Sequence, residues 1–82
     1  MNNLVKLGAK ESIAPEEILL IAKPALTAVR QLAREYARAK KCVDGTGDRR
    51  ANSAILTTDD TLIFSALRIA TVVDRVLKAE AE

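Results

Sequence analysis

Apolar residues gather in short runs separated by polar segments, and this spacing predicts several strands. The runs at 4–7, 18–22 and 42–44 have the length of buried strands, and branched side chains support that assignment for the middle run. The polar segment 9–17 contains Pro15, which predicts a loop or an edge segment rather than a central strand.

Two further apolar runs, 54–57 and 62–64, lie on either side of Thr58–Asp59–Asp60–Thr61. Asp and Thr favour turns because their side chains bond to nearby backbone groups. We therefore predict a β-hairpin with Asp59 and Asp60 at its tip. These two carboxylates indicate a solvated turn rather than a cation site, since no third ligand is evident in the sequence.

Residues 25–41 are rich in Ala, Leu, Arg and Glu, which predicts a helix. Pro24 stands at its start, where a missing N–H costs least. Side chains spaced three or four residues apart predict a buried stripe: Leu26, Val29, Ala33 and Tyr36.

A second helix is predicted from about residue 66 to residue 80, with Ser65 as its N-cap. Its apolar residues again follow the helical repeat and predict one buried stripe: Ile69, Val72, Val73, Val76 and Leu77.

The predicted order is β-β-α-β-β-β-α, an α+β fold with a small, largely antiparallel sheet and two helices packed on it. Eighty-two residues are expected to form a single domain over 1–82. Its core must be aliphatic, because Tyr36 and Phe64 are the only aromatic residues. A few-stranded sheet in such a small domain leaves one face poorly covered, which predicts self-association.

Positive charge is concentrated in the middle of the chain. The net charge is +2, but residues 24–50 carry an excess of four positive charges, while residues 51–82 carry an excess of two negative ones. An anionic partner would therefore dock on the middle third. Arg30, Arg34 and Arg38 recur along one helix flank, where a solvated face explains them better than a helix that reads a DNA groove.

Several classes of chemistry are absent from the sequence. There is no histidine, which removes the usual general base and the commonest metal ligand. Cys42 is the only cysteine and cannot form a zinc site, so we interpret it as a small buried hydrophobe. We expect no catalytic residues, no metal and no cofactor, and hence no enzyme.

The location of the protein is also predicted from absences. A single cysteine cannot form an internal disulfide, and the chain does not open with a signal peptide. The longest uncharged run, 51–58, is far shorter than the roughly 20 apolar residues of a membrane span. We expect a soluble, cytoplasmic protein with no membrane partner.

The loop between the predicted strands at 42–44 and 54–57 is the strongest candidate for function. Gly45 and Gly47 frame Thr46, so the backbone there can adopt positive φ or approach another segment closely. The loop ends in Arg49–Arg50. A nucleotide-binding loop is disfavoured, because the Walker spacing and its GK[ST] ending are absent.

From Leu4 to Arg75 the chain resembles the RemA family of bacterial extracellular-matrix regulators. The resemblance rests on the shared order and spacing of several short elements: Leu4–Gly8, the strand before Pro24, Glu35, Val43–Asp44, Thr46, Arg49–Arg50, Leu62–Ala66 and Arg75. The family's D-A-T-x-G-R-R motif corresponds to residues 44–50, where Asp44, Thr46, Arg49 and Arg50 match.

The resemblance implies a small α+β protein that assembles into rings, binds duplex DNA and activates biofilm-matrix genes. It implies DNA contacts for Arg49 and Arg50, and a weaker one for Arg30, where the family also carries a basic residue. Three departures lower the positive potential expected around this face: Glu17 and Asn52 replace basic residues, and Asp48 replaces a glycine.

We therefore expect a homo-oligomeric transcription regulator that contacts the DNA backbone rather than reading bases. The alternative is a self-assembling structural or adaptor module of the same fold that does not bind DNA.

Overall fold

The computed structural model describes residues 3–81, which form two helices and two sheets in the α+β arrangement predicted from the sequence. The strands are β1 (Val5–Lys6), β2 (Ser12–Ile13), β3 (Ile18–Ala22), β4 (Cys42–Gly45), β5 (Ser53–Thr57) and β6 (Leu62–Ser65). The helices are α1 (Thr27–Arg38) and α2 (Ile69–Ala81), with a 3-10 turn, η1, at Pro15–Glu17. The segment 9–17, predicted as loop or edge, contributes β2 and η1.

The larger sheet has the strand order β3-β5-β6-β4. The predicted hairpin is present as the antiparallel pair β5–β6, and β3 is antiparallel to β5. In contrast, β4 runs parallel to β6, so the sheet is mixed. The strands β1 and β2 form a separate antiparallel pair. The parallel β4–β6 pairing is possible because the long connection through loop 46–52 and β5 returns the chain in the same direction.

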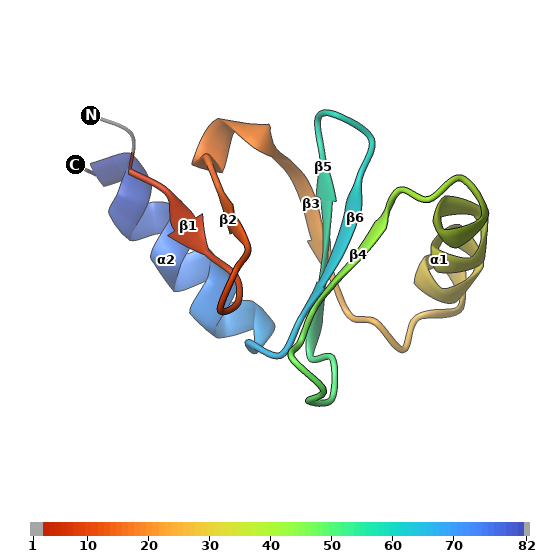
Figure 1. Cartoon of the computed structure of the whole chain (residues 1–82). Helices are drawn as coiled ribbons and strands as arrows, with labels where there is room; N and C mark the ends of the chain where they lie inside the picture. Colours follow the sequence, from red (N-terminus) through yellow and green to blue (C-terminus); the bar gives the residue numbers. More distant parts are fainter. Residues whose placement is uncertain (1–2, 82) are drawn as a thin grey trace.

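The two helices cover opposite faces of the larger sheet, with α2, β1 and β2 on one side and α1 on the other (Figure 1). The buried cluster on the α2 side consists of Val5, Leu7, Ile13, Ile55, Ile63 and Val72. The smaller buried cluster on the α1 side consists of Val29, Ala54 and Leu62, with Ala33 and Tyr36 packed against it.

The α1 face of the sheet is incompletely covered. Helix α1 lies nearest to β4, one edge of the sheet, and the opposite edge is β3 (Figure 1). Leu20 of β3 is paired with Leu56, which packs in the α1-side cluster, yet Leu20 is 50% exposed. The sheet therefore keeps apolar surface on this side, as predicted from the small number of strands.

Helix α1 begins later than predicted, at Thr27. Pro24 lies in a turn closed by the Leu26 amide donating to the Lys23 carbonyl at 3.2 Å, and Leu26 is the N-cap, 49% exposed. The helix ends at Arg38 because Lys40 adopts φ 60°, and the Lys41 amide then bonds to the Tyr36 carbonyl at 2.8 Å. This is a Schellman ending made without glycine.

Helix α2 begins at Ile69, not at residue 66, and Ser65 is not its N-cap. Ser65 ends β6, where its hydroxyl donates to the Leu7 carbonyl at 2.5 Å and accepts from the Leu67 amide at 3.1 Å. The predicted stripe is correct for Val72, which is fully buried, but Leu77 is 62% exposed. Within residues 3–81, no helix is both long and apolar enough to cross a membrane.

The end of α1 is tied to the β5–β6 turn by polar contacts. The Tyr36 hydroxyl donates to a carboxylate oxygen of Asp60, and the Lys41 ammonium lies 3.4 Å from the other. The Tyr36 hydrogen bond, followed by Lys41, holds the pKa of Asp60 below its ordinary value, and the same bond raises the pKa of Tyr36.

Two glycines set the distance between the two sheets. A methyl group on Gly8 would overlap the carbonyl oxygen of Gly45, and one on Gly45 would lie 2.8 Å from the carbonyl oxygen of Phe64. The turn after β1 therefore packs directly on the backbone at the end of β4.

We predict that Gly8→Ala lowers the free energy of unfolding by about 1–3 kcal/mol, because the added methyl forces the backbone at Gly45 to move. Urea unfolding at a fixed protein concentration measures the effect. Gly47→Asn is the control: Gly47 has φ 60° and open space around it, and Asn tolerates that conformation. Equal stability of the two variants would contradict the prediction.

We predict a pH-dependent cost for Tyr36→Phe, which keeps the ring but removes the hydroxyl. Because the pKa of Asp60 is lowered in the fold, its stabilising contribution is present above the unfolded-state pKa and is lost as the pH falls through the folded-state pKa. The variant should be less stable than wild type near pH 7, and the difference should vanish in acid. Thermal unfolding from neutral pH down into acid tests this, and a difference that persists in acid would count against it.

Candidate nucleic-acid interface

The loop at residues 46–52, here called the arginine loop, begins with a turn built by Asp44 and Thr46. One carboxylate oxygen of Asp44 accepts from the Thr46 amide at 2.9 Å and from the Thr46 hydroxyl at 2.6 Å. The Thr46 hydroxyl and then its amide hold the pKa of Asp44 below its ordinary value. These bonds direct the negative charge of Asp44 toward the loop backbone and fix the start of the loop.

The two glycines that frame Thr46 have different roles. Gly45 allows the close approach to the turn after β1, whereas Gly47 supplies a positive φ of 60°. Asp48 continues this left-handed conformation with φ 70°, and the Arg49 amide then closes a turn on the Thr46 carbonyl at 3.2 Å. The backbone therefore reverses sharply just before the arginines.

The end of the arginine loop is held by Asn52. Its side-chain amide donates to the Ala66 carbonyl at 2.9 Å and to the Arg50 carbonyl at 3.4 Å, and its backbone amide donates to the Ser65 carbonyl at 2.8 Å. By resemblance, Asn52 stands where the family has a basic residue. In the structure, Asn52 anchors the loop to the segment that follows β6.

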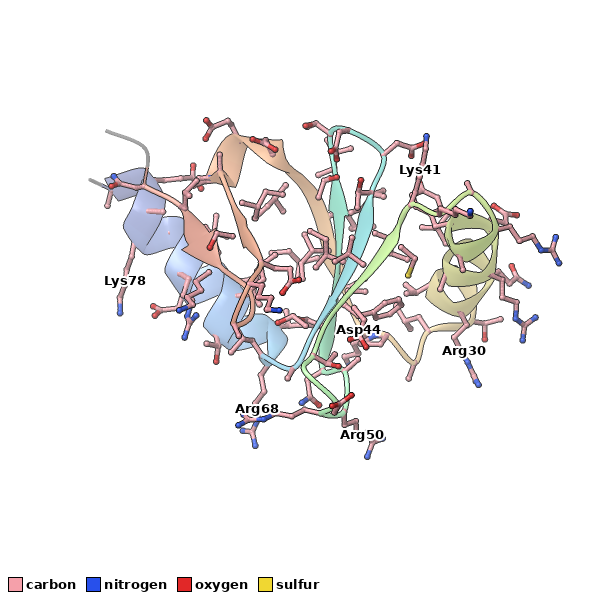
Figure 2. The ribbon with its side chains drawn as sticks, viewed as in Figure 1. Arg30, Lys41, Asp44, Arg50, Arg68 and Lys78 are labelled. Carbon is pink, nitrogen blue, oxygen red and sulfur yellow. The ribbon has the colours of Figure 1, made fainter. Side chains whose placement is uncertain are left out.

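Arg49 and Arg50 are both exposed at the same end of the sheet. Figure 2 shows Arg50 extending from the loop into solvent. Within residues 3–81, neither arginine forms an ion pair: the described pairs are Lys41–Asp60 and Lys78–Asp74. Asp48 is exposed beside them without pairing to either.

Arg30 stands apart from the arginine pair. It is exposed on α1, a different element, and Figure 2 shows it extending away from that helix. The structure brings Arg49 and Arg50 together in one loop, and no described contact joins Arg30 to that loop.

Glu17 does not lie beside the arginine loop within one protomer, contrary to the expectation from the resemblance. Its carbonyl accepts from the Thr58 amide at 2.8 Å, which places it at the β5–β6 turn. That turn and the arginine loop lie at opposite ends of β5 (Figure 1). Five strand residues separate the two ends by roughly 15 Å, so Glu17 lowers the local potential less than the resemblance implies.

A shallow pocket of about 340 Å³ lies next to the arginine loop. It is lined by Leu7–Ala9 from the turn after β1, by Gly45–Gly47 and Arg49, and by Ala66–Leu67. The lining is mostly apolar, and Arg49 is the one charged residue that residues 3–81 contribute to it. Three segments distant in sequence therefore meet beside Arg49.

The described residues form no candidate metal centre, and their one cysteine is not activated. No group of three His, Cys, Asp or Glu side chains in residues 3–81 is arranged to hold a metal ion. Cys42 is half-buried, and burial together with Asp44 raises the pKa of its thiol. A raised thiol pKa disfavours the reactive thiolate.

The sequence reasoning missed Arg68. The resemblance gave it no role, and it falls outside the apolar stripe predicted for the second helix. Figure 2 shows Arg68 and Arg50 at the same end of the molecule. No local pattern points to Arg68, because its position near the arginine loop depends on the bonds from Asn52 to Ser65 and Ala66.

Known proteins resemble this chain over most of its length. A sequence model of the RemA-like family, described as extracellular matrix regulatory protein A-like, matches residues 4–76. A protein of Desulfosudis oleivorans is 30% identical over 89% of this chain and 75% of its own length. A protein of Thermodesulfovibrio yellowstonii is 27% identical over 89% of this chain and 86% of its own length.

A third relative, from Acetivibrio thermocellus, is 28% identical over 96% of this chain and 85% of its own length. All three are named as presumed regulatory proteins, and their names specify neither a ligand nor a partner. The family match covers both sheets, the arginine loop and most of α2. This chain belongs to the RemA-like family.

Proposed function

We propose that this protein is an oligomeric DNA-binding regulator whose Arg49 and Arg50 contact the phosphate backbone of duplex DNA. The observation that carries the proposal is the pair of exposed, adjacent guanidinium groups on a loop that is fixed at both of its ends. A guanidinium matches a phosphate with two parallel N–H donors, and an ordered loop loses little conformational freedom on binding.

The regulatory part of the proposal is supported by the family and by the names of the relatives. The description of the family points to genes for extracellular matrix, and hence to biofilm formation, as the class of target. Such a regulator would work in the cytoplasm, where bacterial DNA lies.

The mode of recognition follows from the position of the arginines. Arg49 and Arg50 lie on a loop rather than on a helix that could enter the major groove. Phosphate contacts from such a loop position the protein, while preference among sequences would come from DNA shape and deformability. Arg30 on α1 is a secondary contact in this proposal.

Self-assembly gives these contacts their strength. Two arginines in one protomer bind DNA weakly, but a ring repeats the pair on every copy, and linked sites bind together far more tightly than separate ones. The exposed leucines of β3, Leu19 (62%) and Leu20 (50%), offer apolar surface for a second copy of the chain. β3 is also a sheet edge with unpaired backbone groups, which another chain can cover.

We predict that replacing both arginines, Arg49→Ala with Arg50→Ala, weakens binding to duplex DNA about tenfold or more at roughly 0.1 M salt. Each phosphate contact contributes about −0.9 to the slope of log affinity against log salt, so the slope should also become shallower. Fluorescence anisotropy across a salt series measures both quantities.

The matched control is Arg34→Ala with Arg38→Ala, which removes the same charge from two exposed positions of α1. Equal weakening in both double variants would contradict a specific role for the arginine loop. Absence of binding by the wild type at low salt would leave the self-assembling adaptor module as the function.

We predict that Leu20→Glu converts the assembly to smaller species, because a carboxylate would be buried in the contact between copies. Light scattering on size-exclusion chromatography measures the mass of the particle. Leu77→Glu on α2 is the control, since Leu77 is exposed to a similar degree. A wild-type monomer, or an assembly that is broken by Leu77→Glu but not by Leu20→Glu, would rule out the proposed interface.

A further inference from the structure

Arg68 is the last residue before α2, and it is exposed at the same end of the molecule as Arg50 (Figure 2). Its backbone carbonyl accepts the first hydrogen bond of the helix, from the Val72 amide at 3.0 Å. The main chain at Arg68 is therefore fixed by the helix, while the side chain extends into solvent.

The segment that carries Arg68 is held next to the arginine loop. Asn52 bonds to the carbonyls of Ser65 and Ala66, so the end of the loop and the start of this segment are joined directly. Arg49 and Leu67 line the same 340 Å³ pocket. Arg68 therefore directly follows a residue that lines the same pocket as Arg49.

The side chain of Arg68 takes part in none of the described hydrogen bonds or ion pairs. It forms no ion pair within residues 3–81, whereas Arg75 of α2 donates to the Lys6 carbonyl at 2.8 Å and ties the helix to β1. A cation at the start of a helix is also disfavoured by the helix dipole, and the first turn of α2 holds no acidic residue to offset it. Stability of α2 does not explain an arginine at this position.

We propose that Arg68 is a third contact to the DNA backbone, at the same end of the molecule as the arginine loop. The inference rests on the proposed DNA-binding function and extends its surface. A duplex that lies across this end of the molecule would meet Arg49, Arg50 and Arg68 together. Because Asp48 reduces the positive potential beside the pair, a third guanidinium contributes a substantial part of the remaining attraction.

The test compares Arg68→Gln with wild type in DNA binding across a salt series, using fluorescence anisotropy with a labelled duplex. We expect Arg68→Gln to weaken binding about three- to tenfold at roughly 0.1 M salt. The salt slope should become shallower by about 0.9 for each phosphate that the variant no longer neutralises. Arg68→Lys should keep most of the slope, since the slope follows the number of charges. Arg34→Gln, an exposed arginine of α1, is the control and should leave the slope unchanged.

A second measurement separates binding from folding. Arg68→Gln removes an unfavourable charge from the start of α2, so its melting temperature should equal or exceed that of wild type. If Arg68→Gln binds DNA more weakly but is as stable as wild type, the inference is supported. An arginine with only a structural role would not give this result. A lower melting temperature with an unchanged salt slope would overturn the inference.

The outcomes also distinguish the two proposals. If Arg49→Ala/Arg50→Ala abolishes binding while Arg68→Gln keeps the slope of the Arg34→Gln control, the inference on Arg68 fails and the proposed function stands. If wild type binds no duplex DNA even at low salt, both fail together.

Discussion

The turn after β1 packs directly against the end of β4, and the positions of the neighbouring segments follow from this contact. Gly8 and Gly45 meet backbone to backbone, and the Ser65 hydroxyl bonds to the Leu7 carbonyl beside them. This junction brings three strand ends together, from β1, β4 and β6. The pocket beside Arg49 exists because these ends meet there, and the arginine loop takes its position from the same junction.

The packing, more than the net charge of +2, decides which charged side chains are available to a partner. Asp44 is bonded to Thr46, Asp60 to Tyr36 and Lys41, and Asp74 to Lys78. Glu17 is held at the far end of β5. The arginines beside the pocket keep their charge available to a polyanion, although Asp48 partly offsets it. In the proposed function, a modest local potential of this kind requires that repeated weak contacts act together.

The small core has a consequence for assembly. Fully buried side chains are concentrated on the α2 side of the larger sheet, and α1 covers the other side mainly near β4. Apolar surface therefore remains on and around β3. A chain of this length gains relatively little from burial within one copy, and the self-assembly proposed above would cover this surface.

Local sequence patterns were enough to predict most of the elements, whereas the contacts between them were not predictable in this way. Strands β3 and β5 and the hairpin lie where the apolar runs place them, and both helices overlap the predicted segments but begin later. The arginine pair was singled out because turn chemistry is local. Ser65, in contrast, is a poor guide to the start of α2 because its hydroxyl bonds to Leu7, which is 58 residues away in the chain. The same cause explains three other features that were not predicted. These are the parallel pairing of β4 with β6, the distance of Glu17 from the arginine loop, and the position of Arg68 at the same end as that loop. Each depends on contacts between distant segments, and no local pattern of residues encodes such contacts.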